Sequence, residues 1–82
     1  MRPVPATITA DWIDSLSDED IVDVEARLHT KFAMLQRRET KLHGTSYQLF
    51  RSPADVMEAW DRWSRVTGML RSRSLTPRRR AA

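Results

Sequence analysis

Apolar side chains recur at three- and four-residue steps in two stretches of the chain, which predicts two amphipathic helices. The apolar positions of the first stretch are Ile21, Val24, Leu28, Phe32 and Leu35. Those of the second stretch are Val56, Ala59, Trp60, Trp63, Val66, Thr67 and Leu70. Each set lies on one face of a helix, so we expect the two faces to share a small core.

Capping signals predict where the helices begin. A serine that can cap the helix is followed three residues later by an acid, a capping-box pattern, at Ser17 with Asp20 and at Ser52 with Asp55. Pro53 suits the first helical position, where no N–H group is needed. Gly68 is a natural terminator of the second helix, which could extend one turn further to Leu70.

The periodicity changes between the two helices. Residues 37–42 and 46–50 are short runs separated by His43, Gly44 and Thr45, a three-residue connection whose glycine can adopt a positive φ. The residues that favour strands here are Thr40, Leu42, Tyr47, Leu49 and Phe50. We therefore predict a β-hairpin, which must pack on the helices or be extended by a neighbouring chain, because an isolated hairpin is marginally stable.

The predicted fold class is α+β, a helix–hairpin–helix domain over residues 17–70 with flexible ends. Residues 1–16 form an N-terminal arm that can hold a short helix capped by Thr9. Trp12 in this arm either folds back onto the core or inserts into a pocket of a neighbouring molecule. Residues 71–82 have almost no apolar content and form a flexible, arginine-rich tail.

Length and composition limit the protein to one small domain. At 82 residues without cysteine, the core alone should supply about 3–5 kcal/mol of stability, and neither disulfides nor thiolate metal sites can add to it. Oligomerisation could add stability. The sequence has neither an apolar run long enough to cross a membrane nor a signal peptide, so we expect a soluble protein made in the cytoplasm.

No set of residues has the pattern of an enzyme active site. The two histidines, His29 and His43, lack metal-ligand spacing, and the acids at 18, 20 and 23 lack the glycine and terminal glutamate of an EF-hand. We therefore expect no catalytic, metal-binding or cofactor-binding residues.

Arginine is the strongest functional signal: the chain has twelve arginines and two lysines, and five of the arginines lie in the last twelve residues. Residues 1–30 carry seven acids and two arginines. An acidic front and a basic tail suit head-to-tail contact between copies, or a tail that binds an acidic surface or nucleic acid; the alternative is a tail that only aids solubility. The predicted partner-binding residues are Trp12, His43, Gly44, Thr45, Arg71, Arg73, Arg78, Arg79 and Arg80.

The order of these parts resembles the gpW-type head–tail joining proteins of tailed bacteriophages. The resemblance covers roughly residues 21–80 and rests on five features: ARLH at 26–29, a basic hairpin, the Ser52–Asp55 cap, VTGM at 66–69 and the arginines at 78–80. The chain departs from the family in its N-terminal extension, its shorter hairpin turn and the two tryptophans of its second helix.

The resemblance implies a non-enzymatic head–tail connector of the virion, made in the host cytoplasm. Copies would form a dodecameric ring under the portal protein, help to retain the packaged DNA and present a docking surface for the next neck or tail protein. The tail arginines would be the portal-binding arm, with Trp12 and the hairpin tip as secondary contacts. The alternative is a small nucleic-acid-binding or regulatory protein that uses the same arginines on phosphates.

Overall fold

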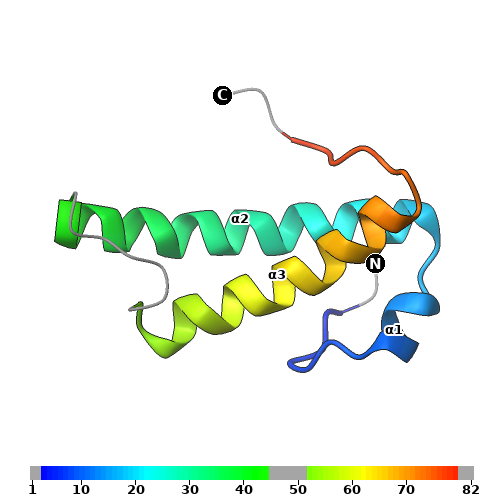
Figure 1. Cartoon of the computed structure of the whole chain (residues 1–82), viewed down its shortest axis with the longest axis horizontal. Helices are drawn as coiled ribbons and strands as arrows, with labels where there is room; N and C mark the ends of the chain where they lie inside the picture. Colours follow the sequence, from blue (N-terminus) through cyan, green and yellow to red (C-terminus); the bar gives the residue numbers. More distant parts are fainter. Residues whose placement is uncertain (1–2, 45–51, 80–82) are drawn as a thin grey trace.

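The computed structural model describes residues 3–44 and 52–79 of the chain (Figure 1). In these residues it has three helices, α1 (Ala10–Asp14), α2 (Asp18–His43) and α3 (Ala54–Ser72), and no strand. Helices α2 and α3 run antiparallel and side by side, with α1 near the end of the pair where α2 begins and α3 ends (Figure 1). The described part of the chain is therefore all-α.

The predicted α+β fold with a β-hairpin is wrong. Residues 37–42, predicted as its first strand, continue α2, and His43 is the last residue of that helix. Residues 37–42 (RRETKL) contain five strong helix formers, two arginines with one glutamate, one lysine and one leucine, which together outweigh the β-type threonine. Thr40 is accommodated because its hydroxyl donates to the Gln36 carbonyl (3.0 Å). The predicted second strand and Thr45 lie outside the described residues.

The helix starts are largely as predicted. Thr9 caps α1 by accepting from the Trp12 N–H (3.2 Å), and Ser17 caps α2 by accepting from the Asp20 N–H (3.1 Å). Helix α3 begins one residue later than the sequence suggested, with Pro53 at the cap position. Both long helices carry acids in their first turn, where the helix dipole favours negative charge.

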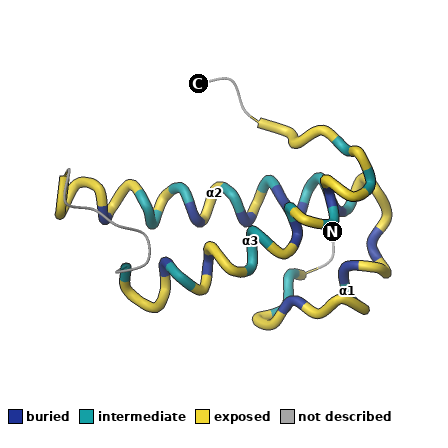
Figure 2. The backbone as a smooth tube through the Cα atoms, viewed as in Figure 1, coloured by how far each residue is buried: buried dark blue, intermediate teal, exposed yellow. Residues whose placement is uncertain are grey.

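Most positions of the predicted apolar stripes form the core (Figure 2), but Trp60, predicted on the core face of the second helix, is 37% exposed. The larger of two buried clusters lies where α1, α2 and α3 meet and consists of Ile8, Ile13, Leu16, Ile21, Val24, Leu28, Val66 and Leu70. The smaller cluster, further along the helix pair, consists of Phe32, Val56 and Ala59. Trp63 packs against both clusters, and Trp12 packs half-buried against the larger one.

The N-terminal arm lies against the helices. Ile8 is buried in the larger cluster and Val4 packs beside it. The Arg62 guanidinium of α3 donates to the Pro5 carbonyl (2.9 Å) and so holds the start of the arm on that helix. None of the helices in the described residues is long and apolar enough to span a membrane.

Helix α3 passes through Gly68 and ends at Ser72, so the glycine does not terminate it, and the alternative end predicted at Leu70 is two residues short. A methyl group added at Gly68 would meet no atom within 4 Å, and the residue has no positive φ. Gly44, which follows α2, has a φ of +57°. Gly44 therefore adopts a backbone conformation that favours glycine, whereas the conformation of Gly68 suits any helical residue.

We expect Gly68→Ala to raise the free energy of unfolding by about 0.5–1 kcal/mol, because alanine is the better residue in a helix interior. Gly44→Ala should lower it by about 1–2 kcal/mol, because a side chain disfavours positive φ. Urea denaturation followed by circular dichroism measures both changes. A loss of stability in Gly68→Ala would contradict the continuous helix.

Candidate functional site: a buried carboxylate and the arginine segment

A tight turn at the end of α3 sends the C-terminal segment back over α2. The Leu75 N–H donates to the Leu70 carbonyl (3.1 Å), and the Ser74 N–H donates to the Arg71 carbonyl (3.0 Å). Ser74 has a φ of +57°. This pair of bonds is a Schellman motif, and Leu75 makes its usual apolar contact by packing on the cluster that contains Leu70.

Within and beyond the turn, three arginines bind three acids near the start of α2. Arg73 donates to the Leu16 carbonyl (2.9 Å) and to the Asp18 carboxylate (3.0 Å). Arg78 pairs with Asp23. Arg79 forms a bidentate pair with Glu25, at 2.6 and 2.7 Å. The segment 73–79 is thus fixed along α2 by a series of ion pairs.

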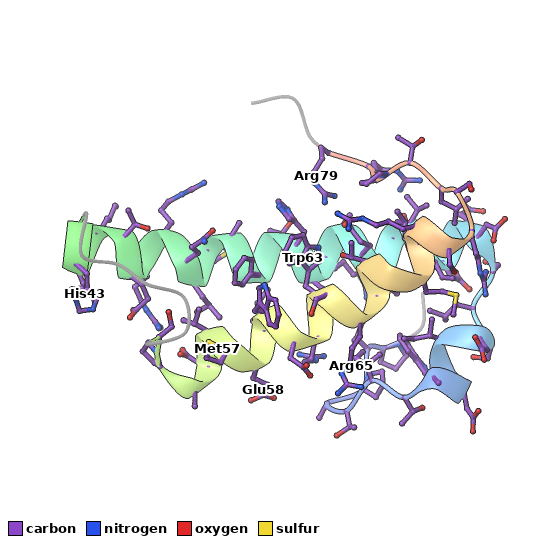
Figure 3. The ribbon with its side chains drawn as sticks, in the orientation of Figure 1. His43, Met57, Glu58, Trp63, Arg65 and Arg79 are labelled. Atoms are coloured by element: carbon purple, nitrogen blue, oxygen red, sulfur yellow. The ribbon has the colours of Figure 1, made fainter. Side chains whose placement is uncertain are left out.

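Glu25 is the centre of this site. Its residue is 0% exposed, and its carboxylate accepts from the Trp63 indole N–H (3.2 Å) as well as from Arg79. The side chain of Arg79 is 39% exposed. Figure 3 shows Trp63 and Arg79 reaching α2 from different parts of the chain, α3 and the C-terminal segment. The Glu25 carboxylate therefore joins α2, α3 and the C-terminal segment.

The pKa of Glu25 reflects opposing effects. Burial alone would raise it, but the hydrogen bonds from Arg79 and Trp63, with the positive charge of Arg79, outweigh burial and hold the pKa below its ordinary value of 4.5. The ionised carboxylate is therefore the form that the fold stabilises.

Two ring contacts hold Trp63 in place. Its ring stacks on Phe32 with centroids 5.3 Å apart, and the His29 ring makes an edge contact at 5.2 Å. These contacts fix the indole so that its N–H points at Glu25. His29 is thus a packing residue of the site.

An open groove of about 700 Å³ lies between the C-terminal segment and the exposed face of α2. Its lining includes Arg27 and Arg37 of α2 and Arg78 and Arg79 of the segment. Arg27 and Arg37 make no ion pair with any described residue, whereas the other two are paired. Ala26, Ala33 and Met34 supply an apolar floor, on which Met34 is 65% exposed.

The structure brings together only some of the predicted partner-binding residues. Arg73, Arg78 and Arg79 lie in one segment on α2, and Arg71 is exposed in the last turn of α3. Trp12 is half-buried on the core, which is the first of the two alternatives predicted for it. His43 and Gly44 are exposed at the distant end of α2, and His43 lies 3.7 Å from Glu39. Thr45 and Arg80 are outside the described residues.

Sequence reasoning missed Glu25, although the pattern contained a signal for it. Glu25 and Glu39 occupy the same four- and three-residue steps as Ile21, Leu28, Phe32 and Leu35, so both are predicted to lie on the core face. Both are buried. A glutamate in an apolar stripe requires a cationic partner, which could have directed attention to the arginines of the tail.

A second ion-pair group ties α2 to the start of α3. Arg38 donates to both oxygens of Asp55 (3.0 and 3.2 Å) and to the buried Glu39 (3.0 Å). The hydrogen bond from Arg38 is the main reason that the pKa of Asp55 is lowered. Within residues 3–44 and 52–79, no three His, Asp or Glu residues gather closely enough to hold a metal ion.

Comparison with known proteins gives no match to any family model, curated protein or solved structure.

We expect Arg79→Met to lower the free energy of unfolding by about 1–3 kcal/mol, because it leaves the buried Glu25 carboxylate with the Trp63 indole as its remaining donor among the described residues. Glu25→Gln should cost less, because glutamine can still accept from Trp63 and water can solvate the released guanidinium. Urea denaturation measures both. Arg71→Met is the matched control, since Arg71 is exposed and unpaired among the described residues, and should change stability by less than about 0.5 kcal/mol. An effect of Arg79→Met as small as this control would contradict the site.

The pH dependence of stability should also report on Glu25. Its pKa is lower in the folded chain, so its contribution is present above the ordinary value of 4.5 and is lost as the pH falls through the folded pKa. Unfolding free energies at about pH 6.5 and about pH 3 should therefore differ less in Glu25→Gln than in the unaltered protein. The control is Glu58→Gln, at an exposed position of α3 outside its first turn, which should retain the decrease.

Proposed function

We propose that the protein is a non-enzymatic structural adaptor that docks on a larger assembly through the arginines of its C-terminal segment. The specific form suggested by its sequence resemblance is a head–tail connector subunit of a tailed phage, with the portal protein as partner. A hairpin was one feature of that resemblance. Its predicted first strand, residues 37–42, is helical, so the hairpin no longer supports the resemblance. Two features remain, the order of the two long helices and the arginine-rich C-terminal end, whereas VTGM at 66–69, which the resemblance places at a helix end, lies inside α3.

The observation that carries this proposal is the bidentate contact between Arg79 and Glu25. In this contact a C-terminal arginine binds the buried carboxylate of a helix with two parallel N–H···O bonds. Arg78 and Arg73 bind acids of the same helix at neighbouring positions. The segment therefore fits a series of carboxylates on a protein, which is the chemistry an adaptor arm needs.

The nucleic-acid alternative is less well supported by these contacts. The three described arginines of the segment all face acids of α2, and those acids would repel a phosphate backbone that approached alongside them. Those acids also repel carboxylates, but an acidic protein surface carries its charges at separate positions and not at every nucleotide, so its carboxylates can reach the exposed sides of the guanidiniums.

The docking test uses a chain that ends after Thr76 and carries Glu25→Gln. This end point keeps α3 and the Leu75 contact, and the glutamine avoids leaving a buried charge without its arginine. We expect this chain to fold, by circular dichroism, and to fail to add a ring of density to purified portal complexes in electron microscopy. Full-length Glu25→Gln is the control and should dock.

Equal docking by the shortened chain would contradict the role of the arginines. Duplex DNA is tested in parallel by gel shift across a range of salt concentrations. Tight binding that weakens steeply with salt and disappears in the shortened chain would favour the nucleic-acid alternative over the adaptor.

A further inference from the structure

The groove beside α2 offers a second surface, which shares Asp23, Arg78 and Arg79 with the ion pairs that hold the C-terminal segment. Its floor follows the exposed side of α2 from Asp23 to Arg37, a length of about 21 Å or four helical turns. Met34 is 65% exposed in the floor, with Ala26 and Ala33 half-buried beside it. The apolar part of the surface is thus narrow and parallel to a helix axis.

Unpaired charge lies near both ends of this apolar strip. Arg27 and Arg37 are exposed, make no ion pair with any described residue and stand about 15 Å apart along α2. Arg78, itself 63% exposed, lies on the opposite wall beside Asp23. The groove therefore combines an apolar strip with an excess of arginine along its edges.

We infer that this groove binds an amphipathic helix of a partner protein, with apolar residues on the face toward α2 and carboxylates along its edges. Small side chains in the floor allow a second helix to approach closely, so its apolar face can cover Met34. Carboxylates about three turns apart on that helix then reach Arg27 and Arg37. The inference rests on the proposed adaptor function and names the chemistry of its partner.

A second copy of the chain fits the groove less well. Its acidic front supplies carboxylates, but the apolar side chains around them, Ile13 and Leu16, are buried in the chain's own core and Trp12 packs on it. That segment has no free apolar face with which to cover Met34. Nucleic acid fits less well too, since phosphates gain nothing from the apolar floor and Asp23 lies in the lining.

The test uses a fluorescently labelled synthetic peptide of about 15 residues, long enough for four helical turns. Leucines at three- and four-residue steps form one face, with glutamates along both edges. Fluorescence anisotropy gives its affinity for the full-length protein, and amide NMR shifts locate the binding surface. We expect shifts along residues 26–37, and about tenfold weaker binding to Arg37→Ala.

The matched control is Lys31→Ala, which removes one exposed cation from the same helix outside the groove, and it should change the affinity by less than about twofold. A peptide with glutamine in place of glutamate should bind more weakly, as should one with serine in place of leucine. Equal effects of Arg37→Ala and Lys31→Ala would overturn the inference. So would equal binding of the glutamine peptide.

Two further measurements distinguish the partner helix from the other possible occupants of the groove. Comparison with the docking test then separates failure of the groove from failure of the proposed function. Sedimentation that shows a dimer abolished by Arg37→Ala would overturn the inference in favour of a second copy. Duplex DNA that displaces the peptide and binds more tightly would overturn it in favour of nucleic acid. If the protein docks on portal complexes but does not bind the peptide, the groove is refuted while the adaptor function stands. Peptide binding without portal docking supports the groove and refutes only the connector.

Discussion

A buried carboxylate constrains most of this small structure. Glu25 is fully enclosed, so its charge must be compensated by groups that are themselves held in place. Trp63 supplies one donor from α3, and its ring is fixed by Phe32 and His29. Arg79 supplies the other two N–H groups from a segment 54 residues further along the chain. Satisfying one side chain thus fixes the spacing of α2 and α3 and the path of the C-terminal segment.

The ion pairs change the interpretation of the charge asymmetry between the N-terminal and C-terminal parts of the sequence. The acidic front and the basic tail suggested contact between copies, or between the tail and another molecule. Within the described residues, the acids at 18, 23 and 25 are bound by arginines of the same chain. The Schellman turn at Ser74 makes this possible by reversing the chain at the end of α3. Much of the asymmetry is therefore satisfied inside the molecule.

The sequence predicted the two long helices and their core faces because apolar periodicity directly reflects burial. Ile21, Val24, Leu28 and Phe32 are all buried, as that spacing requires. The hairpin was predicted wrongly because β-type residues were given more weight than the helix formers around Thr40. The end of α3 was predicted at Gly68 or one turn later at Leu70, short of its position at Ser72, because Gly68 resembles a terminator, while the actual turn uses Ser74 at a position where glycine is usual. The contact between Glu25 and Arg79 links positions too far apart in sequence for local patterns to pair them.

The arginines divide into two groups with different energetic requirements for binding. A partner that breaks the ion pair between Arg79 and Glu25 leaves a buried carboxylate with little compensation for its charge. This cost opposes the exchange of Glu25 for a carboxylate of the partner. Arg27, Arg37 and the exposed Arg71 have no ion-pair partner among the described residues, so contact with them displaces nothing. A partner should therefore engage the unpaired arginines first, and add the outward sides of Arg78 and Arg79 without breaking their internal pairs. In such a complex the C-terminal segment acts as a preformed wall of the binding surface, and the ion pairs that stabilise the fold also shape that surface.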